Sequence, residues 1–196
     1  MKTIYVASED EVSEAVCERL LNETTIGHYQ IVKLRKGGFG YLKSKIKSFV
    51  NLSRMHPVIL LTDLDFCNCP VKLIKEWTKG EEVGKNLIFR VAVREVEAWL
   101  LGDREGMAQL LGISPAKLPR NPENLPDPKR RLLEAAASAR RKIRSEICAE
   151  PGAASAQGIG YNQILSEFAL LKWSPSIASE NCESLRRAIL RIRKIT

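Results

Sequence analysis

The first hundred residues alternate between short apolar runs and stretches with helical spacing, and this alternation constrains the fold more than any other feature. Runs rich in β-branched and aromatic residues predict strands at 2–7, 29–34, 58–61 and 87–93. Strands that alternate with helices usually form a parallel sheet, because each crossover between parallel strands needs a helix's length of chain. We therefore expect an α/β fold with a parallel sheet of about four strands flanked by helices.

The second half of the chain has a different character, since none of its segments shows strand periodicity. Asp127-Pro128 places a capping residue directly before a first-turn proline, which marks the start of a helix. Helices are predicted at 128–147, 161–171 and 183–195. The expected organisation is an α/β core over residues 1–103 and a helical region over residues 104–196 that packs on it.

The positive charge of the chain is concentrated near its C-terminus. Residues 1–127 carry 18 basic and 17 acidic side chains, whereas residues 128–196 carry 13 and 6. A basic region suits a polyanionic partner such as DNA or RNA, because Lys and Arg that neutralise phosphates release counterions. The surface of ordinary solvated helices has the same composition. The charge alone leaves both readings open.

The apolar segments are short, and this excludes an integral membrane protein. No apolar run approaches the roughly 18 to 20 residues that a membrane span needs. The N-terminal segment lacks the longer apolar stretch and the small-residue cleavage site of a signal peptide. The five cysteines are scattered and odd in number, which favours reduced thiols. We expect a cytoplasmic protein without a membrane partner.

Acidic side chains follow the predicted strands. Glu9 follows the first strand, and Asp63 and Asp65 follow the third. The carboxyl ends of the strands form the usual ligand site of an open parallel sheet. Asp63 and Asp65 point to the same side of an extended chain, and converging carboxylates repel each other unless a cation lies among them. A hard cation such as Mg²⁺ can bind a phosphate oxygen and lower the pKa of a bound water. Taken singly, each acid could instead be a helix cap or a solvated turn residue.

These features resemble a known fold family. An acid after the first strand and a D-x-D after a later one is the layout of the TOPRIM fold, which is shared by topoisomerases, primases and the nuclease domains of overcoming-lysogenization-defect (OLD) proteins. Nearly the whole chain is similar to small TOPRIM-like proteins of unknown function that are found beside ABC-type ATPases in bacterial defence loci. The similar segments are EDEVSEAVCERLL from Glu9, VAVREVEAWLLGD from Val91, LPDPKRRLLEAA from Leu125, GIGYNQILSEF from Gly158 and WSPSIASENCESLRRAILRI from Trp173.

The resemblance implies roles for individual residues. It makes Lys129, in the D-P-K segment, a contact of the scissile phosphate, although an exposed lysine in the first turn of a helix is the alternative. The family opening has Gly where this chain has Asp10, so Asp10 either supplies a further ligand or marks a weakened site. The implied ligands of Mg²⁺ or Mn²⁺ are Glu9, Asp63 and Asp65, with Glu97 and Asp103 serving a second ion as in OLD-type nucleases.

The expected activity is metal-dependent cleavage of DNA or RNA by an endonuclease that serves as the effector of a bacterial antiviral defence system. Its catalytic residues are expected to be Glu9, Asp63, Asp65 and Lys129. An ABC-type ATPase subunit is the expected protein partner, and the number of chains in the assembly stays open. The alternative is a non-catalytic regulatory or assembly subunit of such an ATPase complex.

Overall fold

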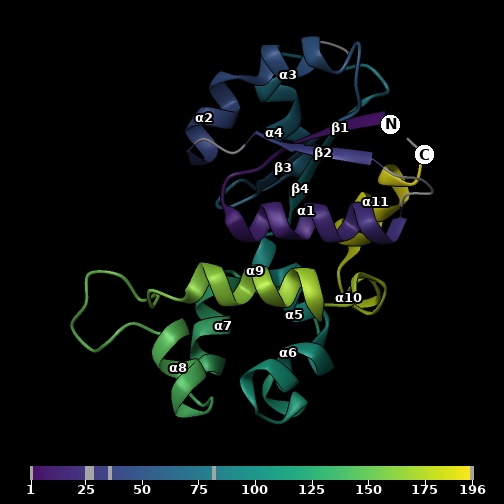
Figure 1. Cartoon of the computed structure of the whole chain (residues 1–196). Coiled ribbons are helices and arrows are strands. Elements are labelled where there is room, and N and C mark those ends of the chain that lie inside the picture. The colour runs from purple at the N-terminus through teal and green to yellow at the C-terminus, as the bar shows by residue number, and fades with distance from the viewer. Residues whose placement is uncertain (1, 25–28, 35–36, 81–82, 195–196) are drawn as a thin grey trace.

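The fold is built on a single four-stranded sheet in which every neighbouring pair of strands is parallel (Figure 1). This computed structural model describes residues 2–24, 29–34, 37–80 and 83–194. The predicted α/β class with a parallel sheet of about four strands is confirmed. The strands are β1 (Lys2–Ala7), β2 (Tyr29–Lys33), β3 (Val58–Asp63) and β4 (Leu87–Ala92).

The order of the strands is β2-β1-β3-β4. The chain runs from β1 to β2 on one side, then crosses β1 to reach β3 and β4 on the other side, so the direction of winding reverses. The central strand β3 is buried along Val58–Thr62, as the continuous apolar run predicts for a strand covered on both faces. In such sheets the crevice at the reversal point, outside the carboxyl ends of the strands, is the usual ligand site. Here that point lies between the ends of β1 and β3.

Helices cover both faces of the sheet. One face carries a buried apolar cluster shared with α2, α3 and α4, and the other face packs against α1 and α11. In the described residues, no helix combines the length and apolar character needed to cross a bilayer. The bounds of these helices are α1 (Glu11–Thr24), α2 (Gly38–Ser44), α3 (Ile46–Leu52), α4 (Pro70–Trp77) and α11 (Glu183–Ile192).

The remaining helices form a layer beyond α1, with α9 packed along α1 (Figure 1). One apolar cluster extends from Ile4 in the sheet through Trp99 to Ile192 in α11. The segments on either side of residue 103 therefore share a hydrophobic core. The helices of this layer are α5 (Val96–Gly102), α6 (Arg104–Leu111), α7 (Pro128–Ala136), α8 (Arg141–Ile147), α9 (Tyr161–Leu171) and α10 (Pro175–Asn181), with 3₁₀ turns at Pro115–Lys117 and Pro122–Asn124.

Three details of the helical region differ from the sequence prediction. The helix expected at 128–147 is broken into α7 and α8 by a turn at residues 137–140, which includes Ala139, a residue buried in the shared core. The short helix α10 was not expected, although Ser174 caps it by accepting the backbone N–H of Ile177. The last helix ends at Ile192, and the predicted end at residue 195 lies outside the described residues.

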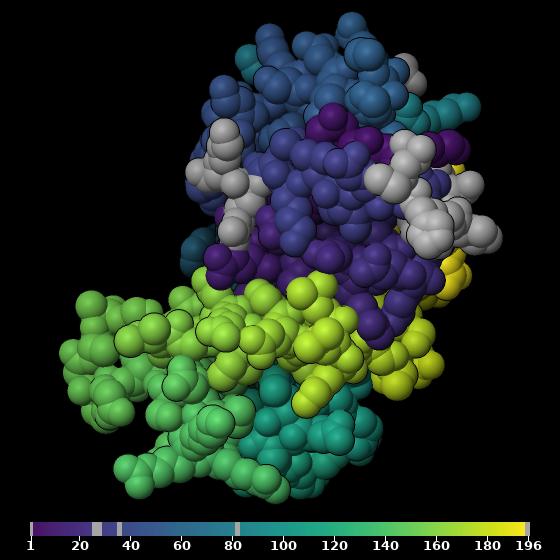
Figure 2. Space-filling view, in the orientation of Figure 1, coloured from purple at the N-terminus to yellow at the C-terminus, as the bar shows by residue number. Residues whose placement is uncertain are grey.

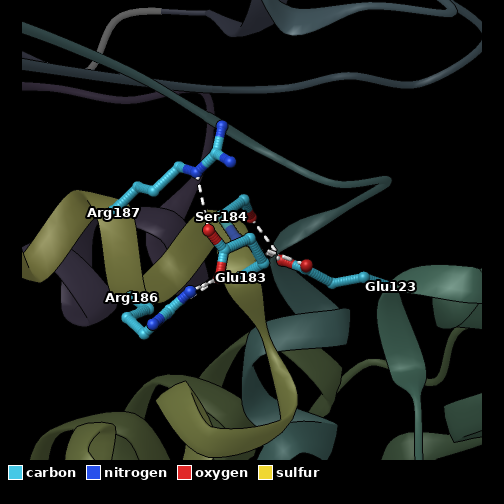
Figure 3. Close-up of polar contacts among 5 residues, drawn as sticks. All are labelled: Glu123, Glu183, Ser184, Arg186 and Arg187. Carbon is cyan, nitrogen blue, oxygen red and sulfur yellow. Dashed lines mark hydrogen bonds and ion pairs between the residues drawn. The ribbon is translucent and has the colours of Figure 1, made fainter.

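A polar junction fixes α11 to the end of β4 and to α5. The Glu123 carboxylate accepts hydrogen bonds from the backbone N–H and the hydroxyl of Ser184 at the start of α11, as Figure 3 shows. The Ser184 hydroxyl accepts the indole N–H of Trp99 at 2.7 Å and the backbone N–H of Val93 at 3.3 Å. Because these contacts join segments far apart in sequence, the junction holds the C-terminal helix in its place on the sheet.

Candidate functional site

Glu9 and Asp63 lie side by side at the crevice between β1 and β3. Glu9 lies two residues after the end of β1, and its Oε1 atom accepts hydrogen bonds from the Thr62 hydroxyl and from the backbone N–H of Asp63 at 3.1 Å. The second carboxylate oxygen of Glu9 has no hydrogen bond within the described segments. Burial raises the pKa of Glu9, against the lowering effect of its two hydrogen bonds, and nearby negative charges add to the rise.

Asp63 lies at the centre of the acidic group. Its Oδ1 atom accepts the backbone N–H of Val96 at 2.9 Å, which ties the end of β3 to the start of α5. Burial raises the pKa of Asp63 well above its ordinary value. Neighbouring negative charges raise it further, and they come from Glu97, Glu9, Asp10 and Asp65.

Asp65 occupies the tip of a tight turn with a left-handed backbone, at φ 47°. The turn closes through a hydrogen bond from the Cys67 N–H to the Leu64 carbonyl at 2.9 Å. The Arg94 guanidinium donates to the Asp65 and Cys67 carbonyls at 3.0 Å, and the Arg94 carbonyl accepts the N–H groups of Leu64 and Asp65. The Asp65 side chain is exposed, and the hydrogen bonds to Arg94 hold the backbone of its turn in place.

A second wall of the site comes from the helices. Glu97 in α5 is 1% exposed, and its Oε1 atom accepts the Tyr161 hydroxyl at 2.7 Å and lies 3.4 Å from the Lys129 ammonium. Its Oε2 atom is buried without a hydrogen-bond partner. Burial raises the pKa of Glu97, although Lys129 and Tyr161 act in the opposite direction. A buried carboxylate oxygen without a donor is costly.

Lys129 belongs to this wall, although a solvated lysine was the alternative for it. Its ammonium lies 5.8 Å from the centre of the Tyr161 ring and is paired with Glu97, and its backbone N–H donates to Glu95 Oε2 at 2.8 Å. Burial alone would lower the pKa of Lys129, but the charges of Glu97, Glu95 and Asp10 outweigh that effect and raise it. The charged form of Lys129 is therefore stabilised inside the site.

Asp10 and Asp103 contribute in ways that the sequence left open. Asp10 caps α1 by accepting the Ser13 N–H at 2.8 Å, and its charge still reaches Asp63, Glu97 and Lys129. Asp103 is held differently, because its two oxygens accept the backbone N–H groups of Gly106 and Ser174 at 3.0 and 2.9 Å. The structure gives Asp103 the role of a helix cap at the far end of α5, so we do not retain it as a metal ligand.

Tyr161 and Glu95 complete the site, and the sequence assigned neither of them a role. Tyr161 is the first residue of α9 and lies 64 positions from Glu97 along the chain. Burial raises the pKa of Glu95 to about 6, against the lowering effect of its bond to Lys129. The segment GIGYNQILSEF contained the one available signal, a tyrosine directly after a Gly-Ile-Gly sequence.

A family model matches residues 7–169, a span that contains every side chain of this site. The chain belongs to the family described as Domain of unknown function (DUF4276). No curated protein and no solved structure matches it. The DUF4276 span ends within α9, so α10 and α11 lie beyond it.

The donor set of the site fits a hard divalent cation, although the carboxylates are not gathered around one point. Within residues 2–24, 29–34, 37–80 and 83–194, no three His, Cys, Asp or Glu side chains are arranged as an assembled metal site. Mutual repulsion favours separated carboxylates, and Glu9 and Asp63 each turn an oxygen toward hydrogen-bond donors. Glu97 Oε2 has no hydrogen-bond partner, and burial raises the pKa of Glu9, Asp63 and Glu97, so a bound cation would stabilise the ionised form of these three carboxylates.

Proposed function

We propose that this protein is a metal-dependent nuclease with a TOPRIM-like core, and that it hydrolyses DNA or RNA phosphodiesters at the crevice between β1 and β3. The observation that carries the proposal is the position of Asp63, whose pKa is raised by burial and by the carboxylates around it at the switch point of the sheet. Perturbed acids in such a crevice favour a functional site over a structural one.

Glu9, Asp63 and Asp65 would hold Mg²⁺ or Mn²⁺, and Glu97 would support a second ion through its free Oε2 atom. When bound, such an ion polarises a phosphodiester and lowers the pKa of a coordinated water. The protein's own contribution would be to hold these carboxylates at the ends of β1 and β3 and at the start of α5. Thr62 and the Val96 N–H orient Glu9 and Asp63 for this purpose.

Lys129 would contact the scissile phosphate. Glu97 and Tyr161 fix the position of its ammonium, and the surrounding acids keep it protonated. A positive charge held in a fixed place stabilises the negative charge that develops on the phosphoryl oxygens. Glu97 is in this respect a positioning residue for Lys129.

The nucleic acid would approach over α7, whose first turn places Lys129 in the site, and over α8. Their basic residues are Lys129, Arg130, Arg131, Arg141, Lys142 and Arg144. Neutralising phosphates along such a surface supplies affinity without sequence preference. We further propose that the protein works in the cytoplasm as the effector of an antiviral defence system, with an ABC-type ATPase subunit as its partner.

Cleavage assays test the nuclease proposal. Plasmid DNA and tRNA are incubated with the protein in Mn²⁺, in Mg²⁺ and in EDTA, beside the variants Asp63→Ala and Glu76→Gln. Glu76 is an exposed carboxylate on α4 that pairs with Lys43, so its variant controls for the loss of one acid. We expect cleavage that needs the metal, survives in Glu76→Gln and is lost in Asp63→Ala. Cleavage in EDTA, or a fully active Asp63→Ala protein, would contradict the proposal.

The alternative is a non-catalytic subunit of an ABC-type ATPase complex. The separated carboxylates favour it, because among the described residues no three ligands are already assembled. Calorimetry with Mn²⁺ and Mg²⁺ distinguishes the two functions. No metal binding, together with co-purification of an ATPase, would support the subunit function.

A further inference from the structure

Two large apolar side chains on the rim of the site are completely exposed. Phe66 is 99% exposed and Ile159 is 105% exposed. Single exposed apolar residues are common on protein surfaces and need no explanation. These two, however, lie close in sequence to residues of the proposed active site, Phe66 directly after Asp65 and Ile159 two residues before Tyr161.

Phe66 is presented by a rigid turn on the sheet side. It directly follows Asp65 within the turn that Arg94 clamps through the Asp65 and Cys67 carbonyls. The charge of Asp65 contributes to the raised pKa of both Asp63 and Glu9, so this turn adjoins the acidic group. The Phe66 ring therefore stands in water beside the carboxylates, with its backbone fixed.

Ile159 is presented by a rigid bracket on the helical side. The N–H groups of Gly158 and Gly160 donate to the Ile147 and Glu146 carbonyls at 2.9 and 3.0 Å. A Cβ atom on Gly158 would lie 2.3 Å from the Glu146 carbonyl oxygen, so the close approach requires glycine there. This bracket ends at Gly160, directly before Tyr161, whose hydroxyl donates a hydrogen bond to Glu97.

The starts of α1 and α9 lie side by side on the surface of the molecule. Figure 2 shows the purple start of α1, which follows Glu9, beside the yellow-green start of α9. Two residues of chain span at most about 7 Å, so Ile159 lies close to the start of α9. Tyr161 at that start contacts Glu97, which pairs with Lys129.

We propose that Phe66 and Ile159 pack against the faces of unpaired bases on either side of the cleaved phosphodiester, so that the site takes single-stranded DNA or RNA. This inference rests on the proposed nuclease function. In a duplex the base faces are stacked on each other and only their edges are open, whereas an unpaired base offers its face to an apolar side chain. Lys129 and the basic α7 and α8 supply the charge that the phosphates between those bases require.

Binding by Phe66 variants is the test, measured in an Asp63→Asn background so that the nucleic acid stays intact. Fluorescence anisotropy compares a labelled single-stranded oligonucleotide with its duplex. One lost base stack corresponds to a weakening of roughly 5- to 150-fold. We expect Phe66→Ala to weaken single-strand binding by this factor and to leave duplex binding unchanged. Phe66→Trp, which keeps an aromatic face, should bind the single strand as tightly as the protein with Phe66 does. Ile159→Ala should give a smaller loss, because an aliphatic side chain lacks an aromatic face.

Met55→Ala and Leu171→Ala are matched controls, since both side chains are more than half exposed, at 80% and 73%, on other elements. They should leave binding and the melting temperature unchanged. Equal effects of Phe66→Ala on single-strand and duplex binding, or no effect on either, would overturn the inference. The nuclease proposal would still be supported in that case if the unmodified protein showed metal-dependent cleavage. A protein that neither binds nor cleaves any of these nucleic acids would overturn both.

Discussion

The two ends of α5 each bear a buried acid, and the two acids are satisfied in different ways. Glu97, near the start of the helix, is 1% exposed and has one oxygen without a donor, while the other meets Tyr161 and Lys129. Asp103, just after its end, is 2% exposed, and each of its oxygens accepts a backbone N–H. A fully bonded buried carboxylate is part of the architecture, whereas an incompletely bonded one among other acids is retained at a cost.

This contrast separates two meanings of a buried acid. Backbone donors compensate Asp103 permanently, so it needs no further partner. At Glu97, Lys129 and Tyr161 do not offset the effect of burial, so its pKa is raised, and burial and neighbouring acids raise the pKa of Asp63 as well. Substitutions at the two ends of α5 should therefore have opposite consequences for activity and stability.

Replacing Glu97 should have the largest effect on activity. Glu97→Gln removes the charge that pairs with Lys129 and the proposed support of a second ion. We expect the cleavage rate at saturating Mn²⁺ to fall by about 10²-fold or more, as losses of transition-state charge stabilisation usually do. The free energy of unfolding should change little, because the removal of a buried charge is offset by the lost pairing with the Lys129 ammonium. An unchanged rate in a folded Glu97→Gln protein would break the distinction between the two ends of α5.

Replacing Asp103 should instead affect stability. Asp103→Ala removes the cap of α6 and leaves the Ser174 N–H without its acceptor, and these losses together should cost about 2 to 3 kcal/mol. Urea denaturation measures this loss. Asp103→Asn keeps one acceptor oxygen and should lose less. The folded Asp103 variants should cleave at the normal rate, and a selective loss of cleavage without destabilisation would return Asp103 to the metal site.

The sheet and the strand-end acids could be predicted from the sequence because the signals are local. The apolar run that begins at Val58 is typical of a strand buried on both faces, and Asp63 and Asp65 follow it directly. Parallel strands bring their carboxyl ends to one edge, so the meeting of Glu9 with Asp63 follows from topology alone.

The helical wall could not be predicted in the same way, because its contacts are distant in sequence. Tyr161 meets Glu97 across 64 residues, and nothing in either segment specifies the other. The break between α7 and α8 has no Gly or Pro to mark it. Asp103 would directly follow a helix whether it were a helix cap or a metal ligand. Only its hydrogen bonds with the Gly106 and Ser174 N–H groups identify it as a cap.

The pH dependence of stability should measure how strongly burial disfavours the ionised form of these carboxylates. The pKa of Glu95 is about 6 in the folded protein against an ordinary value of 4.5, so the folded state holds this proton more tightly than the unfolded state does. The free energy of unfolding should therefore fall as pH rises from 4.5 to about 6. For this half-exposed group the loss should be roughly 1 kcal/mol.

Glu95→Gln should flatten that part of the profile, and Glu76→Gln should leave it unchanged. Glu9, Asp63 and Glu97 act in the same direction, because burial raises the pKa of each. Saturating Mg²⁺ or Mn²⁺ favours the ionised carboxylates and should reduce the fall. A stability that rises with pH through this window would show that the acids are already compensated, as Asp103 is.

The smallest expected effect is at Asp10, which combines the two kinds of acid. Its Oδ1 atom caps α1 as Asp103 caps α6, while its charge reaches Asp63 and Glu97. Asn is as good an N-cap as Asp, so Asp10→Asn should change the free energy of unfolding by less than about 0.5 kcal/mol. If Asp10 serves only as a cap, cleavage should stay within a few-fold of normal and Mn²⁺ affinity, measured by calorimetry, should be unchanged. A loss of cleavage as large as that expected for Glu97→Gln would instead make Asp10 a metal ligand, and would show that a capping acid can serve the metal site with its second oxygen.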